Sequence, residues 1–272
     1  MPSIEPAAVR WSVHAFRVDQ PERPIINENP DLVLPSASTA KILVLLAVAL
    51  GIERGDLAAD ELLERSSVDP VADSGIWQHL DAAALTLHDA ATLVGLCSDN
   101  LATNALIARL GGLTPVAAVA AELAITGLAL HDIVRDERTA EHRATLSTGS
   151  ARGYATLMAR LVRADGIPAS VAARVLAWLS LGVDHSMVAA AFGLDPLAHQ
   201  RPDRGFTVIN KTGTDEGVRV DAGVVSAGDR TIAYACLAHW PADVAGTERD
   251  HVLAEMRSIG ERLRAELAPS GP

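Results

Sequence analysis

The sequence contains few cysteines, few aromatic residues and almost no lysine. Of its 272 residues, 3% are aromatic, two are cysteine, and only Lys41 and Lys211 are lysine, so that 23 − 2 = 21 basic residues are arginine. Two cysteines, Cys97 and Cys236, do not make a disulfide framework, and we expect both to be reduced thiols of the core. Because arginine supplies the ordinary positive charge, a position that keeps lysine is expected to need a group that can lose a proton.

Long apolar runs and clusters of positive charge are also missing. Residues 42–50 are too few to span a bilayer, and the alanine-rich stretch 113–130 is interrupted by Pro115 and Glu122. The net charge of 23 − 34 = −11 argues against nucleic acid or an anionic membrane as a partner. No secretory signal is visible at the N-terminus. We therefore expect a cytoplasmic protein as the sequence is written, or a secreted or periplasmic one if a leader has been trimmed.

Strand patterns occupy the two ends of the chain. With 49% apolar residues, a chain of 272 residues can bury a full core. Apolar and polar residues alternate over 9–15, as in a half-buried strand. Gly228 and Asp229 fit a tight turn between the last two strands. The expected strands are 9–15, 24–29, 206–210, 220–227 and 231–239.

Helical patterns fill the middle of the chain and its C-terminal tail. Thr86 is a typical helix cap, and Gly111-Gly112 is a typical helix end. The order of elements predicts an α/β fold of the α+β type, in which an antiparallel sheet built from both termini is flanked by helices and carries an inserted all-helical domain. We expect residues 1–36 plus 202–272 to form the sheet domain and residues 37–201 the all-helical domain. The expected helices are 38–51, 87–97, 100–110, 114 onward, 150–164, 168–180, 185–191 and a tail helix from about 252.

The first lysine follows a serine at helical spacing. Ser38 and Lys41 are separated by three residues at the start of a long apolar segment, so they share one face of the expected helix. A hydroxyl beside an amine at a helix N-terminus provides a nucleophile and a candidate base. The alternative is an N-cap serine with an incidental lysine.

Two further short motifs support the chemical interpretation. Ser98-Asp99-Asn100 lies between two expected helices, and Lys211-Thr212-Gly213 ends an expected strand. Each motif alone is weak, whereas the ordered set of three is specific. The three motifs can meet only at the seam between the sheet and the helical domain, where active sites often form.

These motifs resemble those of class A β-lactamases and penicillin-binding proteins, over residues 10 to about 268. The separation of 98 − 38 = 60 residues and the flanking segments 74–80 and 217–224 are also similar to this superfamily. The resemblance implies a β-lactamase-like fold and an acyl-enzyme on Ser38. Lys41 would be the base, with its pKa lowered by burial and by Lys211, and Ser98 would relay the proton to the leaving nitrogen.

The resemblance also implies the groups that bind the substrate. The backbone N–H groups of Ser38 and Thr214 would form the oxyanion hole. Asp99 would fix its loop, and Cys97 would lie near the site without taking part. Trp77 is either part of the rim or a core residue. The predicted substrate-binding residues are Asn100 for an amide, Lys211, Thr212 and Arg219 for a carboxylate, Thr214 for the oxyanion and Trp77 at the rim.

One part of the family pattern is incomplete. Class A enzymes place a water-activating glutamate on the loop before the helix that we expect near Ser150, and follow it with Pro-x-Leu-Asn. In this chain Arg135-Asp136-Glu137 resembles the family's Arg-x-Glu, but the Pro-x-Leu-Asn segment is missing. We therefore predict Glu137 as the deacylating base, with Glu141 as the alternative. Without such a base, acylation would proceed and deacylation would stall.

Three functions remain open at this stage. The first is a serine β-lactam hydrolase of class A type, with water deacylation. The second is a peptidase or esterase of the same superfamily that acts on a non-lactam substrate, and the third is a penicillin-binding or sensor domain that acylates without turnover. We expect no cofactor and no metal, because Gly-x-Ser-x-Gly, His-Glu-x-x-His and phosphate-binding glycine loops are missing. We expect a monomer whose partner is a small-molecule substrate.

Overall fold

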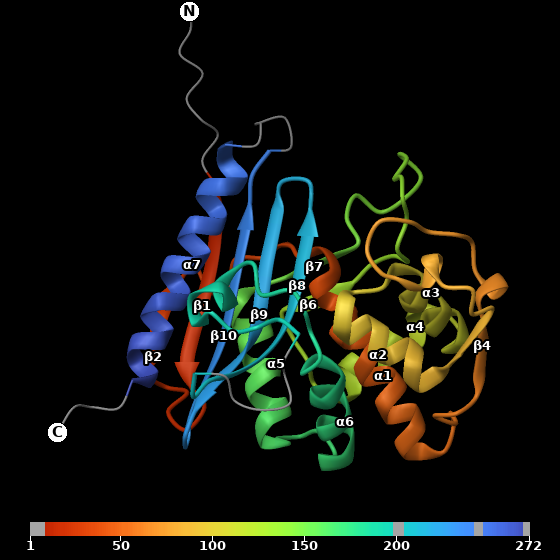
Figure 1. Ribbon diagram of the computed structural model, residues 1–272, viewed down its shortest axis with the longest axis horizontal. Coiled ribbons are helices and arrows are strands. Elements are labelled where there is room, and N and C mark those ends of the chain that lie inside the picture. Colours follow the sequence, from red (N-terminus) through yellow and green to blue (C-terminus); the bar gives the residue numbers. More distant parts are fainter. Residues whose placement is uncertain (1–8, 198–203, 242–246, 269–272) are drawn as a thin grey trace, which may run out of the picture.

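The protein is a sheet with helices on both faces, joined along one edge to a block of helices (Figure 1). The computed structural model describes residues 9–197, 204–241 and 247–268. The five-stranded antiparallel sheet has the order β2 (Pro24–Glu28), β1 (Arg10–Arg17), β10 (Arg230–His239), β9 (Val218–Ala227), β8 (Thr207–Asp215).

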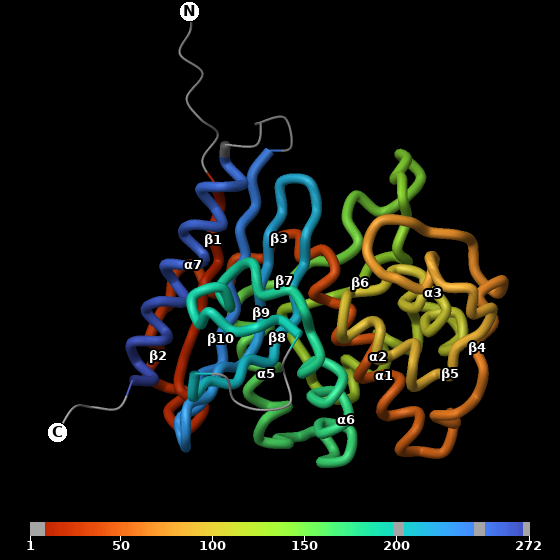
Figure 2. The backbone as a smooth tube through the Cα atoms, viewed as in Figure 1, coloured from red at the N-terminus to blue at the C-terminus, as the bar shows by residue number. Residues whose placement is uncertain are grey.

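Both ends of the chain build this sheet, as the sequence predicts. Val13 of β1 pairs with Cys236 of β10, and the two strands lie side by side over their whole length (Figure 2). β9 and β10 form a hairpin that turns at Gly228, whose φ of +60° suits glycine. Strand β8 is left at the edge nearest to the helical block, so the residues of Lys-Thr-Gly face that block.

The two faces of the sheet carry different side chains because alternate residues of a strand point in opposite directions. On β10, Tyr234 and Cys236 join the core cluster formed with α7 (Thr247–Leu267) and the short 3-10 helix η4 (Val188–Phe192). Ala233 and Ala235 join the larger cluster that includes α5 (Ala151–Arg163). The predicted alternation therefore positions helices on both faces.

Helix α1 (Lys41–Arg54) forms the centre of the helical block. It is buried continuously from Lys41 to Leu50 and contacts the four surrounding helices. Asp89 N–H donates to Thr86 Oγ1 at 3.0 Å, which confirms the predicted cap. The surrounding helices are α2 (Leu87–Cys97), α3 (Asn100–Arg109), α4 (Leu113–Glu122) and α6 (Ala169–Leu179).

Short elements complete the block and join it to the sheet. β3 (Leu34–Pro35), β7 (Ser147–Gly149) and β6 (Leu128–Leu130) form a small three-stranded sheet beneath the start of α1. β4 (Leu62–Glu64) pairs with β5 (Ala84–Thr86). Three 3-10 helices lie in the connections: η1 (Ala37–Ala40), η2 (Arg65–Ser67) and η3 (Trp77–His79).

Three local expectations differ from the structure. α5 lies within the predicted helical domain, yet it packs on β9 and β10, because its apolar face covers one face of the sheet. The helix expected at 185–191 is the 3-10 helix η4, which contacts α7. The helix expected from Ser38 begins as the 3-10 turn η1 and becomes α-helical only at Lys41.

Within the described part of the chain, no single helix is long and apolar enough to cross a bilayer. Helices α3 and α4 reach the required length and composition only together, and their axes differ by 81°. Both cysteines are free thiols, with Cys236 buried in the sheet and Cys97 partly exposed at the end of α2.

Candidate active site

Ser38 lies on the 3-10 turn η1, at the seam between the helical block and strand β8. It is partly exposed and lines a cavity of about 160 Å³. The residue before it, Ala37, is buried and has a φ of +45°, which is unusual for a residue with a side chain. Gly213 permits β8 to approach this turn, because a Cβ there would clash with the carbonyl oxygen of Ser36 and with Thr39 Oγ1. The sequence motifs around Ser38 and Lys211 are thus in direct contact.

Lys41 is completely buried beneath this turn, and its amine is held by the second motif. Its Nζ donates to the carbonyl oxygen of Ser98 at 2.6 Å and to Asn100 Oδ1 at 2.7 Å, and lies 3.3 Å from Ser98 Oγ. Burial, and then the charge of Lys211, hold the pKa of Lys41 well below its usual value. An amine whose pKa is lowered in this way loses its proton more readily than an exposed lysine and can then act as a base.

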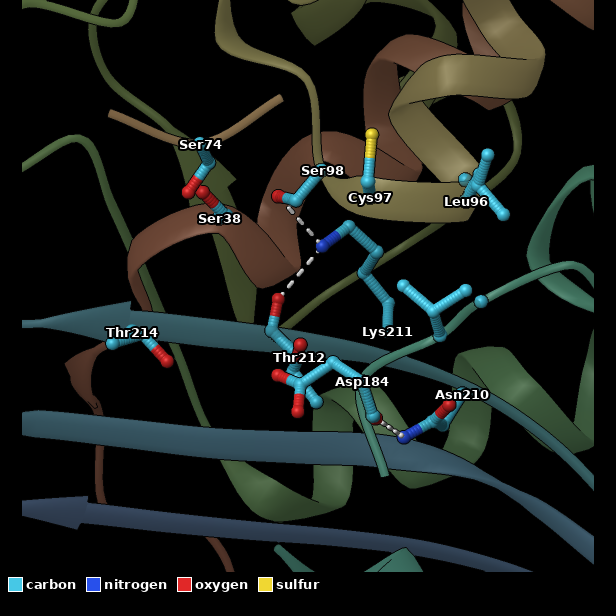
Figure 3. Close-up of a pocket in the computed structure, with 13 residues that line it drawn as sticks. Ser38, Ser74, Leu96, Cys97, Ser98, Asp184, Asn210, Lys211, Thr212 and Thr214 are labelled. Atoms are coloured by element: carbon cyan, nitrogen blue, oxygen red, sulfur yellow. Dashed lines mark hydrogen bonds between the residues drawn. The ribbon is translucent and has the colours of Figure 1, made fainter. Parts of the chain in front are cut away.

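Ser98 lies between the two lysines of the chain. Lys211 Nζ donates to Ser98 Oγ at 2.9 Å and to the carbonyl oxygen of Thr212 at 2.8 Å (Figure 3). Burial lowers the pKa of Lys211 to about 8, although the nearby Asp184 acts in the opposite direction. Ser98 itself has a φ of +59° where α2 ends, which turns its side chain back toward the cavity. The hydroxyl of Ser98 can therefore exchange a proton with either amine.

Asp99 and Asn100 hold the loop that carries Ser98. Asp99 Oδ1 accepts a hydrogen bond from Ala102 N–H and caps α3, while Oδ2 accepts from the N–H groups of Ile76 and Trp77. This is the structural role expected for Asp99. Asn100 is buried, and besides holding Lys41 it donates from Nδ2 to the carbonyl oxygen of Ala72 at 2.9 Å. Both ends of its amide are thus bound to protein.

Three predicted substrate-binding residues lie outside the cavity lining: Asn100, whose amide is bound on both sides by protein, Trp77 and Arg219. Trp77 is fully buried, and its Nε1 donates to the carbonyl oxygen of Ala82, so it is a core residue and its rim position is corrected. Arg219 directs its guanidinium to the carbonyl oxygens of Asp215 and Val218, and stands 5.8 Å from the ring centroid of Trp240. These contacts hold Arg219 at a position outside the cavity lining.

The loop 131–146 brings no carboxylate to the cavity. The structure describes this whole loop, and none of its residues is among those that line the cavity. Glu137 and Glu141 are exposed on its outer side, so the positions predicted for a base are not met. Asp132 is bound by Arg135 and Arg138, and Asp136 accepts from the N–H of Ala72 at 2.8 Å.

One loop residue is instead clamped by helix α3. Val134 N–H donates to Asn104 Oδ1, and Asn104 Nδ2 donates to the carbonyl oxygen of Val134, both at 2.9 Å. Asn104 lies one helical turn after Asn100 and therefore on the same side of α3. Val134, an apolar residue that is 8% exposed, is thus the loop residue that helix α3 clamps, and it lines a neighbouring cavity rather than the one that Ser38 lines.

Asp184 is a cavity residue that sequence reasoning missed. It is the one carboxylate among the described lining residues. Although burial raises the pKa of Asp184, hydrogen bonds from Ser186 and Thr212 and the charge of Lys211 outweigh burial and lower it. The sequence offers no motif around Asp184 that would mark it as a site residue. The cavity is lined by Ser38, Ser74, Gly95, Leu96, Cys97, Ser98, Gly182, Val183, Asp184, Asn210, Lys211, Thr212 and Thr214.

The site thus combines a partly exposed hydroxyl, two buried amines and a second hydroxyl between them. Such a set can transfer an acyl group to Ser38 and move protons through Ser98. Among the residues that the structure describes, no group of three or more His, Cys, Asp or Glu side chains is arranged to hold a metal ion.

Comparisons with known proteins identify the same architecture. A family model described as the β-lactamase enzyme family matches residues 3–265, and no curated protein sequence matches the chain. The β-lactamase of Sphaerobacter thermophilus is 22% identical, with a TM-score of 0.78 over 97% of this chain and 94% of that chain. A mutant of PBP-A, in an acyl-enzyme complex with penicillin G, is 22% identical, with a TM-score of 0.77 over 95% and 90% of the two chains.

A class A β-lactamase from Mycobacterium abscessus is 21% identical, with a TM-score of 0.74 over 94% of each chain. At these identities the similarity shows a shared fold. The β-lactamase-like architecture expected from the three motifs is therefore confirmed.

Proposed function

The chain belongs to the β-lactamase enzyme family, and on that premise we propose that it opens β-lactam rings by forming an acyl-enzyme on Ser38. The observation that carries the proposal is the position of Ser98, whose hydroxyl lies 3.3 Å from Lys41 Nζ and 2.9 Å from Lys211 Nζ in the cavity that Ser38 lines. A serine nucleophile requires a base nearby, and a buried amine of lowered pKa can be that base.

Acylation begins with loss of the Ser38 proton. Lys41, neutral for part of the time because its pKa is lowered, accepts this proton as the oxygen attacks the lactam carbonyl. The carbonyl oxygen becomes an oxyanion that the N–H groups of Ser38 and Thr214 stabilise. When the C–N bond breaks, Ser98 gives its proton to the leaving nitrogen and is reprotonated by one of the two amines.

The opposite end of the cavity binds the substrate. Lys211 supplies positive charge and Thr214 supplies a hydroxyl group on the same strand, whereas the Thr212 hydroxyl is already engaged by Asp184. This arrangement supports binding of an acidic group such as the carboxylate of a penicillin. Asn100 serves mainly to hold Lys41. Arg219 does not contact the cavity, so it can attract the substrate only through its long-range positive charge.

We propose further that the acyl-enzyme is long-lived. Water is a poor nucleophile unless a base takes its proton. The 131–146 loop carries no carboxylate into the cavity, and its residue clamped by helix α3 is the apolar Val134. Asp184 is held by hydrogen bonds from Ser186 and Thr212, and the charge of Lys211 helps to keep its pKa low, which makes it a poor base. This favours rapid acylation with slow hydrolysis, as in the penicillin-binding alternative.

The similarity to PBP-A is consistent with this proposal. That protein, as a mutant, has been captured in an acyl-enzyme complex with penicillin G. A peptidase or esterase that uses the same acyl-enzyme on a linear substrate remains the second candidate, since the amine released from a linear amide can diffuse away and leave the ester open to another nucleophile.

The test is intact-mass spectrometry over time after addition of penicillin G. We expect an adduct of one penicillin per chain that forms within minutes and persists for hours, and none with Ser38→Ala. A Ser38→Ala protein that still gains the adduct would disprove the nucleophile. If the wild-type protein never gains an adduct but cleaves ester or peptide substrates, the β-lactam proposal fails and the peptidase or esterase function is supported instead.

A further inference from the structure

Three buried hydroxyl groups connect helix α5 to the peptide bond before Ser38. Tyr154 OH donates to Ser36 Oγ at 2.7 Å, Ser36 Oγ and Ser147 Oγ are 2.8 Å apart, and Ser147 Oγ donates to the carbonyl oxygen of Ala37 at 2.6 Å. All three residues are fully buried. The chain of contacts begins on a sheet-covering helix and ends at the residue before the nucleophile.

The protons of this chain all point in one direction. Each hydroxyl carries a single proton. Because Ser147 uses its proton on the carbonyl oxygen of Ala37, the proton between the two serines belongs to Ser36, and Tyr154 supplies the proton to Ser36. Burial raises the pKa of Tyr154, so its hydroxyl stays a donor at any working pH. Hydrogen bonds aligned in this way polarise one another.

The end of the chain is the peptide group that contains the N–H of Ser38. In a trans peptide the C=O of Ala37 and the N–H of Ser38 point in opposite directions, so fixing one fixes the other. This N–H lies in the first turn of a helix, where it has no partner within the helix. The φ of +45° at Ala37, the residue that supplies the carbonyl of this peptide, is costly for a residue with a side chain and needs surrounding contacts to hold it.

We propose that Tyr154, Ser36 and Ser147 form a hydroxyl relay that aims and polarises the N–H of Ser38 as an oxyanion-hole donor. These are positioning residues, since they act on the substrate only through the peptide between Ala37 and Ser38. The inference rests on the proposed acylation of Ser38. It adds that the strength of the oxyanion hole is set by side chains behind the nucleophile, on strand β7 and helix α5.

The relay makes a graded prediction. Ser147→Ala removes the donor to the carbonyl oxygen of Ala37, and we expect the acylation rate constant for penicillin G to fall about 10- to 100-fold, less than the loss of a whole oxyanion donor. Tyr154→Phe removes a hydroxyl that lies two hydrogen bonds beyond Ser147 and keeps the ring in place, so we expect the acylation rate constant to fall only about 3- to 10-fold. The dissociation constant of the initial complex should change less than about threefold, because the oxyanion forms only in the transition state.

A spectroscopic readout separates aiming from general structural damage. The ester carbonyl of the acyl-enzyme, labelled with ¹³C in penicillin G and followed by difference infrared spectroscopy, should absorb at higher wavenumber in both variants than in wild type, because its hydrogen bond is weaker. Tyr234→Phe is the matched control. It removes the other tyrosine hydroxyl of the chain, also buried, from the opposite face of the sheet, and it should leave the carbonyl band unmoved.

Each outcome decides the relay. If wild-type protein forms the adduct and both variants show the wild-type carbonyl band with acylation within twofold, the relay is refuted while the acyl-enzyme stands. If the Ser147→Ala protein does not fold, the carbonyl band and acylation rate of Tyr154→Phe alone decide whether the relay exists. If the wild-type protein gains no adduct, the proposed function fails, and the relay fails with it.

Discussion

The substitution Val134→Glu tests whether the missing carboxylate is what limits turnover. Val134 is held at both backbone polar groups by Asn104, at 2.9 Å each, one helical turn from the Asn100 that binds Lys41. A glutamate there extends about 5 Å from its Cα, a reach comparable to the spacing of about 5–6 Å between neighbouring turns of a helix. We therefore predict that the variant carboxylate reaches past Asn104 toward the acyl ester on Ser38 while the loop keeps its two hydrogen bonds to Asn104.

The expected magnitude follows from general-base catalysis. A positioned base accelerates proton transfer by about 10²- to 10⁴-fold. We expect deacylation of the penicillin adduct to rise at least 100-fold and acylation to stay within about threefold, because Lys41 and Ser98 are untouched. Replacing a nearly buried valine with a carboxyl should destabilise the fold by about 1–3 kcal/mol, which thermal unfolding will register.

The assay isolates the acyl-enzyme by rapid desalting and follows its mass as the adduct clears. Val134→Gln is the matched control, since it has the same size and cannot accept a proton at neutral pH. Glu137→Gln in the wild-type background should change nothing, because Glu137 is exposed outside the cavity. A wild-type adduct that clears within seconds, or Val134→Glu and Val134→Gln proteins that clear it equally slowly while folded, would refute the reasoning.

Two other predictions concern the lysines. Lys41→Arg should reduce acylation at least 100-fold by the same mass assay, because arginine keeps its charge and cannot act as a base; acylation within tenfold of wild type would remove Lys41 from that role. Acylation by penicillin G should decline above about pH 8 as Lys211 loses the proton that attracts the carboxylate. Asp184→Asn removes a charge that raises the pKa of Lys211, so the alkaline limb should move to lower pH, and a limb that stays in place or moves upward would contradict that coupling.

The sequence predicted the parts of the site that rest on local motifs. Lysine is used only where a buried, titratable amine is needed, so Lys41 and Lys211 could be singled out from 272 residues. The strand pattern at both ends likewise predicted the sheet, because alternation is a local signal. Ser98 followed from its motif, and the structure brings it between both amines.

The errors involve residues whose roles depend on long-range packing. Trp77 sits in a motif-like segment, but whether it faces the core or the cavity is decided by Asp99, which binds its N–H from 22 residues away. Glu137 matched a short family pattern. The loop, however, is fixed at Val134, whose backbone N–H and C=O are both bound by Asn104 of helix α3. Asp184 has no motif at all and reaches the cavity only because the segment after α6 runs beside Asn210, in the middle of β8.

The pairing of β1 with β10 has a consequence for biosynthesis. Val13 finds its partner Cys236 only after the ribosome has made 236 − 13 = 223 further residues, and β8, which bears Lys211, has no neighbour until β9 follows it. Contacts of such wide separation form late. A nascent chain therefore carries Ser38 and Lys41 without the strand that completes the pocket, and the pocket can form only after β8 and its neighbour β9 have both been made.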